Sequence, residues 1–308
     1  MPSRTALTLR PPILSDLPEL TAFFAAIRDE HRSRGSTEAQ LRDQLTSKHA
    51  NADENYRVAI VDGAIAGWVS VWYPEPTSER FFFDVDAYPR DGDMYRCLLE
   101  WAEERTREVA AGRAVRMHAG AAADNEPLLD ELRQREYELV RHFFDMEIDL
   151  ADEPAQPVWP AGINVRTFEP GDERPLYEAD FEAFEDHWDS FRVPFEDWRA
   201  YFVGSSEFDP TLWFLAEDGG EIAGFALCTN ERRPDTGYVN VLGVRRPWRR
   251  RGLGTALLLH AFHEVRRRGR AKVDLNVDAE NLTGAVGLYE RAGMHAVRRY
   301  DSYRKELA

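Results

Sequence analysis

One short stretch of the chain combines three arginines with two glycines at the start of a predicted helix. It reads RRRGLG, residues Arg249–Gly254, and Thr255 follows it. The first turn of a helix has N–H groups without intrahelical partners and carries a partial positive charge. Glycine lets the backbone approach a bound phosphate closely, and arginine adds fixed positive charge. The stretch is therefore suited to binding a pyrophosphate.

Two cofactor classes use a turn of this kind, and the spacing distinguishes them. In a Rossmann dinucleotide site the glycines follow their strand directly, and an acidic residue lies about 20 residues further on. Asp274 meets the second condition. However, residues 245–251 separate the predicted strand from Gly252, and Leu257 stands where a third small residue is needed. The pattern therefore disfavours a nucleotide-dependent oxidoreductase.

Periodic patterns predict the elements that position the turn. The strand before it should alternate simply, so that Tyr238, Asn240 and Leu242 share one face and Val239, Val241 and Gly243 share the other. The order of the predicted strands and helices indicates an α/β fold (an α+β mixed sheet) with helices on both faces. The predicted strands are Ile163–Arg166, Leu212–Ala216, Glu221–Cys228, Gly237–Val244, Lys272–Val277 and His295–Tyr303, and the predicted helices are Pro175–Phe184, one from Gly252, and Leu282–Ala292.

The chain contains this unit twice. LTLRPPILSDLPEL from Leu7 matches INVRTFEPGDERPL from Ile163, and two further blocks match at a spacing that stays near 156–159 residues. A proline-containing segment without periodicity joins the copies. We therefore expect a tandem duplication with a domain at 1–151, a linker at 152–161 and a second domain at 162–308.

Two motifs of the second copy resemble those of the GNAT superfamily of N-acetyltransferases. The turn Arg249–Gly254 is similar to motif A of that superfamily, and NLTGAVGLYERAGM, residues Asn281–Met294, is similar to its motif B. The resemblance covers nearly all of residues 163–305, and the first copy shares its outline. Two tandem GNAT-like acyl-CoA N-acyltransferase domains, one of them active, are similar in architecture to the mycothiol synthase type.

The resemblance implies transfer of an acetyl group from acetyl-CoA, as cosubstrate, to the primary amine of a small molecule. Tyr289 aligns with the general acid that protonates the departing thiolate. The backbone of the strand before motif A would pair with the pantetheine and supply oxyanion donors. The implied coenzyme-binding residues are Leu242, Gly243, Val244, Arg249, Arg250, Arg251, Gly252, Leu253, Gly254, Thr255 and Asn281.

The sequence leaves the general base open. Related two-domain enzymes carry a glutamate where this chain has Tyr238, and a phenol is a poor base at neutral pH. Glu185, Asp186 and His187 are alternatives, and His187 has a suitable unperturbed pKa. A water chain without a dedicated base is a further alternative. We expect Glu185, His187, Trp188 and Tyr238 to border the acceptor, with neighbouring aromatic side chains forming an apolar or cation-binding wall.

The first copy departs from motif A. Its equivalent, Pro89–Met94, carries one glycine and two aspartates, and carboxylates repel phosphate. Leu132 or Arg133 replaces the tyrosine. We therefore expect the first domain to be degenerate, non-catalytic and structural.

Composition narrows the remaining possibilities. A net charge of -16 disfavours nucleic acid as a partner and favours cationic ligands. Cys97 and Cys228 are expected to be reduced core residues. The chain shows neither a secretion signal nor an apolar run long enough for a bilayer. We expect a cytoplasmic monomer or homodimer with no metal and no membrane partner; the alternative function is a non-catalytic acyl-CoA-binding or sensing module.

Overall fold

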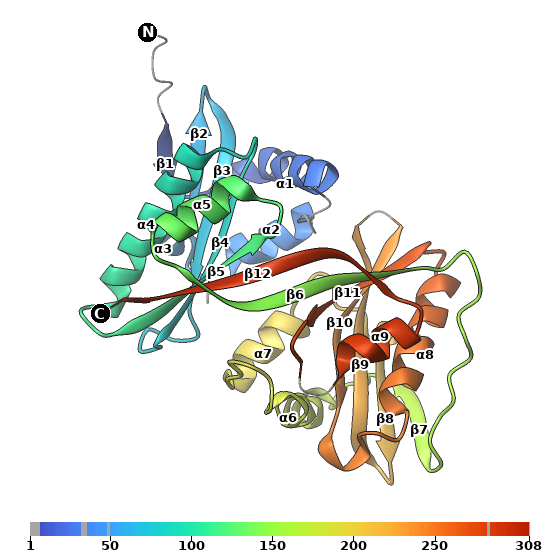
Figure 1. The fold of residues 1–308 in the computed structure, drawn as a ribbon. Helices are drawn as coiled ribbons and strands as arrows, with labels where there is room; N and C mark the ends of the chain where they lie inside the picture. Colours follow the sequence, from blue (N-terminus) through green and yellow to red (C-terminus); the bar gives the residue numbers. More distant parts are fainter. Residues whose placement is uncertain (1–6, 32–35, 48–49, 234, 282–283, 308) are drawn as a thin grey trace. The chain divides into compact units, whose positions relative to one another are not determined.

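The computed structural model describes residues 7–31, 36–47, 50–233, 235–281 and 284–307. Its contacts divide the chain into two compact units, one formed by Met1–His142 with Tyr300–Ala308 and the other by Phe143–Arg299. Each unit has its own set of strands (Figure 1). Each unit also has its own hydrophobic cores.

The first unit is a mixed sheet in the order β1-β2-β3-β4-β5, completed by the end of β12. The β4–β5 pair is parallel and the other pairs are antiparallel. One core lies under α4 and α5, and a second contains residues of α1, α2 and α3. The elements are β1 (Thr8–Arg10), η1 (Leu14–Asp16), α1 (Leu17–His31), α2 (Glu38–Thr46), α3 (Ala52–Asn55), β2 (Tyr56–Val61), β3 (Ala64–Trp72), β4 (Arg80–Ala87), α4 (Gly92–Ala110), β5 (Val115–Ala122), α5 (Glu126–Gln134) and β6 (Glu138–Asp149).

The second unit repeats this plan. Its sheet runs from the end of β6 through β11, β10, β9 and β8 to β7, with β10 and β11 parallel and the other pairs antiparallel. Helices α8 and α9 pack on one face, and α6 and α7 pack on the other (Figure 1). The elements are β7 (Ile163–Thr167), α6 (Glu173–Phe184), α7 (Phe195–Phe202), η2 (Pro210–Leu212), β8 (Trp213–Asp218), β9 (Glu221–Arg233), β10 (Thr236–Val244), η3 (Arg246–Trp248), α8 (Leu253–Arg267), β11 (Lys272–Asp278), α9 (Ala285–Arg291) and β12 (His295–Leu307).

The repeated order and the helices on both faces confirm the mixed α/β fold expected from the sequence. Most element bounds agree with it to within a few residues. The last helix begins later than expected, at Ala285; residues 282 and 283, where its start was predicted, lie outside the described residues.

The compact units do not follow the boundaries of the duplication. Residues 143–149 of β6 belong to the first copy, yet they pair with β11 of the second unit. Residues 300–307 of β12 belong to the second copy, yet they pair with β5 of the first unit. Each copy therefore supplies one sheet strand to the other unit, and the expected division at 151 and 162 marks the sequence repeat rather than the packing.

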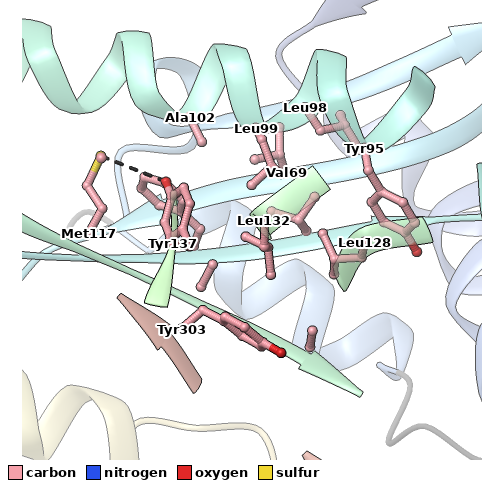
Figure 2. Packing of buried hydrophobic residues seen from close by; sticks show 14 of the residues in the cluster. Val69, Tyr95, Leu98, Leu99, Ala102, Met117, Leu128, Leu132, Tyr137 and Tyr303 are labelled. Atoms are coloured by element: carbon pink, nitrogen blue, oxygen red, sulfur yellow. Dashed lines mark hydrogen bonds between the residues drawn. The ribbon is translucent and has the colours of Figure 1, made fainter. Parts of the chain in front are cut away.

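Tyr303 shows how firmly the end of the chain is built into the first unit. Its side chain is 5% exposed and lies in the core formed with Leu128 and Leu132 of α5 (Figure 2). An aromatic ring buried in this way contributes several kcal/mol of stability. The core of the first unit therefore includes Tyr303, which lies more than 160 positions after Glu138, where β6 begins.

Strand β10 contains an irregularity that the sequence pattern did not predict. Val239 lies opposite Cys228 of β9, but Val241 lies opposite the adjacent Leu227, so Asn240 is an inserted residue. A bulge of this kind reverses the alternation of side chains. Val239 and Leu242 consequently pack on the α8 side, and Val241 packs on the α6 side. The expected simple alternation through the strand is wrong for this reason.

We expect Tyr303→Ala to lower the free energy of unfolding by about 3–5 kcal/mol, because it empties a buried aromatic site. Chemical denaturation followed by circular dichroism measures this. Glu306→Ala, at an exposed position of the same strand, should change stability by less than about 0.5 kcal/mol. Equal, small effects of the two substitutions would show that the end of β12 frays from the first unit.

Candidate functional site

A cavity of about 440 Å³ opens in the second unit between β10 and β11. The two strands pair in parallel only from Thr236 to Tyr238 on the β10 side. Beyond that point each strand contributes a row of residues to the cavity wall. Helix α6 and the segment after it close one side, and α9 closes another. The lining residues are Phe143, Asp180, Phe181, Phe184, His187, Asp189, Ser190, Phe191, Val239, Asn240, Val241, Leu242, Leu275, Asn276, Val277, Asp278, Asn281, Ala285 and Tyr289.

The separation of the strands leaves the backbone of β10 available on one side. Its other side is held by β9, which pairs with it as far as Val244. The bulge at Asn240 lies at the point where β11 departs. Parallel neighbours normally satisfy each other's N–H and C=O groups. The backbone of residues 239–242 can therefore donate and accept hydrogen bonds within the cavity.

Gly243 is required by packing against β9. A Cβ atom at this position would lie 2.3 Å from Cζ of Phe225, and that ring is fully buried. Any larger residue would have to displace the ring or the strand. The glycine thus keeps β10 close to β9 immediately after the cavity. Its neighbour Leu242 lines the cavity, whereas Val244 packs at the edge of the core beneath α8.

The turn before α8 has the backbone conformation that its glycine predicts. Gly252 is the N-cap residue with φ of 85°, in the left-handed region, and no side chain in the described part of the chain caps the helix. Arg250 also has a positive φ, of 60°. A Cβ at Gly254 would approach Cδ1 of Leu288 to 3.2 Å, so this glycine lets α8 pack closely on α9. The first N–H groups of α8 are thus left without a side-chain acceptor.

The three arginines of the turn have different environments. Arg249 donates from Nε to the Val244 carbonyl at 3.0 Å and from Nη2 to the Ala183 carbonyl at 2.9 Å. It also pairs with Asp186 at 3.2 Å. Arg250 is exposed, and Arg251 lies 4.0 Å from Asp218. Arg249 therefore ties the end of α6 to the end of β10, while Arg250 and Arg251 extend toward solvent beside the uncapped helix.

Tyr289 contributes a phenol to the cavity wall. Its side chain is 8% exposed. Burial, with a smaller contribution from Tyr238, raises the pKa of Tyr289 to about 12. Because the neutral form is the protonated form, the hydroxyl keeps its proton throughout the physiological range. It is therefore a proton donor and not a base.

His187 and Asn281 meet at the mouth of the same cavity. Asn281 Nδ2 lies 3.4 Å from His187 Nε2, and both residues line the wall. The His187 ring also packs edge-on against Phe184, with 4.5 Å between ring centroids. Two residues that are 94 positions apart in sequence are thus brought to one place.

The other residues expected at the acceptor lie outside the lining set. Asp186 accepts hydrogen bonds from Arg246 and Arg249, and these guanidinium groups lower its pKa. Glu185 is exposed and lies 3.4 Å from Arg246. Trp188 is partly buried, and Tyr238 is buried beneath the point where β10 and β11 separate. This geometry favours His187 over Glu185 and Asp186 as a residue that meets a ligand.

Asp180 is a cavity residue that the sequence reading missed. It lies in α6, and Trp198 Nε1 donates a hydrogen bond to its Oδ2 at 2.9 Å. Burial raises the pKa of Asp180 to about 6, and the Trp198 bond opposes this shift. The available signal was its position four residues after the buried Leu176 and three before the buried Ala183, which places a carboxylate on the buried face of an amphipathic helix.

The equivalent turn of the first unit is closed by its own side chain. Asp91 is the N-cap of α4, and its carboxylate accepts from the Met94 N–H at 2.9 Å. An aspartate N-cap satisfies a free N–H and places negative charge at the positive end of the helix. Leu132, one of the two residues expected to correspond to Tyr289, is fully buried. The two halves thus present opposite electrostatics at equivalent helix ends.

Comparisons with known proteins identify the family that the chain resembles. The model of the acetyltransferase (GNAT) family matches residues 174–294. The chain is 31% identical to a mycothiol acetyltransferase of Streptomyces griseus over 281 residues. This alignment covers 89% of this chain and 86% of that protein.

Solved structures match over both units. A GCN5-related N-acetyltransferase from Sphaerobacter thermophilus is 33% identical with a TM-score of 0.79, covering 99% of this chain and 96% of that one. A tandem GNAT protein from the clavulanic acid biosynthesis pathway has a TM-score of 0.77 and covers 98% of each chain; at 18% identity it supports the fold alone. The tandem arrangement expected from the sequence is confirmed.

We expect Arg249→Gln to lower the free energy of unfolding by about 1–3 kcal/mol, because the Val244 and Ala183 carbonyls lose their donor. Arg250→Gln is the matched control at the adjacent exposed position and should change stability by less than about 0.5 kcal/mol. Denaturant unfolding of both variants provides the comparison. A neutral Arg249→Gln would mean that this arginine does not fasten α6 to β10.

Proposed function

The chain belongs to the GNAT family of acetyltransferases, and we propose that its second unit moves the acetyl group of acetyl-CoA to a small primary amine by direct attack. It is an acyl-CoA N-acetyltransferase that uses acetyl-CoA as cosubstrate. The observation that carries the assignment to this site is the cavity itself, in which the open backbone of β10, Asn281 and the protonated Tyr289 face one space.

The residues around α8 fit a coenzyme pyrophosphate. The uncapped N-terminus of α8 offers backbone N–H groups and a partial positive charge. Arg250 and Arg251 are exposed beside it. We assign the pyrophosphate to Arg250, Arg251 and the turn Gly252–Thr255, with Arg249 holding the turn in place through α6. Acetyl-CoA, when bound, supplies the thioester that the amine attacks.

The backbone of β10 would bind the pantetheine and the reacting carbonyl. We propose that Leu242, Gly243 and Val244 pair with the pantetheine amides, and that N–H groups of this strand donate to the carbonyl oxygen as it gains negative charge. The support for this role is the departure of β11, which leaves the strand without a parallel partner from Val239 onward. Asn281 would contact the coenzyme from the opposite wall.

Tyr289 would donate its proton to the departing sulfur. Burial raises the pKa of Tyr289 to about 12, so the phenol keeps its proton and remains a donor throughout the physiological pH range. His187 remains a candidate to receive the amine's proton, as does a water chain. We assign Glu185, Trp188 and Tyr238 to outer contacts of the acceptor, since other residues form the cavity wall.

The acceptor is a small molecule. A cavity of about 440 Å³ admits a group of metabolite size. Its wall combines aromatic rings, such as Phe181 and Phe191, with carboxylates, such as Asp180 and Asp189. The relatives named mycothiol acetyltransferase also support a small acceptor.

We further propose that the first unit binds no coenzyme and acts structurally. Asp91 already occupies the end of α4 that a phosphate would need. The net charge of -16 argues against nucleic acid. No group of three potential metal ligands is found among the described residues, and no helix within those residues is long and apolar enough to cross a bilayer. Separately from these findings, we propose, as expected from the sequence, a metal-independent cytoplasmic enzyme that is a monomer or homodimer.

We expect Tyr289→Phe to lower kcat by about 10²–10⁴-fold without changing acetyl-CoA affinity, because only the transferable proton is removed. Thiol release from acetyl-CoA in the presence of an amine panel, with calorimetry for binding, measures both. The matched control is Tyr201→Phe, since Tyr201 is 75% exposed.

With a pKa near 12, Tyr289 should cause no alkaline loss of the wild-type rate below about pH 11. A Tyr289→Phe rate within twofold of wild type would exclude the general-acid role.

A further inference from the structure

Asp180 lines the cavity, and Trp198 is its one polar side-chain partner among the described residues. Trp198, which is 2% exposed, donates to one carboxylate oxygen at 2.9 Å. Within the described residues Asp180 makes no ion pair; the arginines near α6 pair with other carboxylates instead. Arg192 pairs with Glu178, Arg245 with Glu182, and Arg246 and Arg249 with Asp186.

A carboxylate in this setting is costly unless a cation reaches it. Burial disfavours the ionised form, and one neutral indole N–H compensates for only part of the lost hydration. The hydrogen bond from Trp198 does not require a negative charge, since the side-chain oxygen of an asparagine at position 180 could also accept it. The charge is therefore unexplained by the fold and available to a cationic ligand that enters the cavity.

The surroundings of Asp180 match an alkylammonium group. Phe181 and Phe184 of α6, Phe191 of the following segment and Phe143 of β6 line the same cavity. Aromatic rings and a carboxylate that line the same cavity are suited to binding ammonium, through cation–π attraction and a strong ion pair. Tyr289, the proposed proton donor to sulfur, faces the same space from α9.

We propose that Asp180 binds the acceptor's ammonium group and takes its proton before attack. This inference rests on the proposed function and names the group that fills the place of the glutamate that the sequence lacks. The proton moves from R–NH3⁺ to the Asp180 carboxylate and gives R–NH2 and the neutral acid. The nitrogen lone pair then forms the N–C bond while the C–S bond breaks.

The remaining protons balance in the same site. Tyr289 donates its proton to the thiolate, and the nitrogen gives up its second proton to solvent as the amide forms. Solvent returns a proton to Tyr289 and removes one from Asp180. The ionisable groups that share the cavity with Asp180 are His187 and Asp189 from the segment after α6, Asp278 from β11 and Tyr289 from α9.

The matched variant is Asp180→Asn, which keeps an acceptor for Trp198 and removes only the charge. A first readout is binding, using cyclohexylamine and its neutral analogue cyclohexanol as probes in ligand-observed NMR titrations. Wild type should bind cyclohexylamine at least about tenfold more tightly than cyclohexanol, and Asp180→Asn should bind the two within about twofold. Glu178→Gln, on the exposed side of α6, is the control and should retain the wild-type preference.

The second readout is the rate with a reactive amine from the panel. Asp180→Asn should lower kcat/KM for the amine by about 10²-fold or more while calorimetry shows unchanged acetyl-CoA affinity. The wild-type kcat/KM should rise with pH through an apparent pKa of about 6, and this step should disappear in the variant. If Asp180→Asn folds poorly, Asp180→Glu is used in its place, because it keeps the charge. A preference of Asp180→Glu for cyclohexylamine over cyclohexanol supports the proposal, and loss of this preference contradicts it.

The outcomes separate the two proposals. If wild type acetylates amines and Asp180→Asn does so equally well with an unchanged probe preference, Asp180 has only a packing role. If wild type binds acetyl-CoA but acetylates none of the panel, while the probe preference depends on Asp180, the amine site stands and the proposed transfer fails. A preference that is equal in all three proteins overturns the assignment of the ammonium site.

Discussion

The separation of β10 from β11 after Tyr238 is the constraint on which the site depends. A sheet normally satisfies its backbone groups on both sides of each interior strand. Here β9 holds one side of β10 throughout, and the buried Phe225 ring against Gly243 keeps that side tight. The opposite side faces a cavity instead of a strand. The bulge at Asn240 allows the strand to do this while its larger side chains still reach both cores.

The two halves show how a few residues decide whether the N-terminus of a helix is open or already occupied by a carboxylate. Gly252 leaves the N-terminus of α8 open, whereas Asp91 closes that of α4 with its own carboxylate. The exchange of β6 and β12 residues gives each unit a strand segment from the other copy. The core around Tyr303 is completed by the end of the chain, and the sheet of the second unit is completed by residues 143–149.

Sequence reasoning succeeded where chemistry is local and failed where it depends on tertiary packing. The turn at Gly252 was predictable, since a left-handed N-cap and neighbouring arginines are encoded in adjacent positions. The bulge at Asn240 was not, because alternation cannot reveal an inserted residue that only the β9 register defines. The strand exchange was hidden by the duplication, which marks ancestry and not contacts. Asp180 was overlooked because its neighbours Trp198 and Tyr289 lie far away in sequence, and Arg249 proved to have structural partners at the end of α6.

Hydrogen–deuterium exchange with and without saturating coenzyme A tests the central claim most directly, namely that β10 offers an open backbone beside an open helix end. The account predicts slower exchange at the amides of residues 241–244 and at the first turn of α8, with no change in β4 or the first turn of α4. Unchanged exchange along β10, or equal protection in β4 and α4, would contradict it.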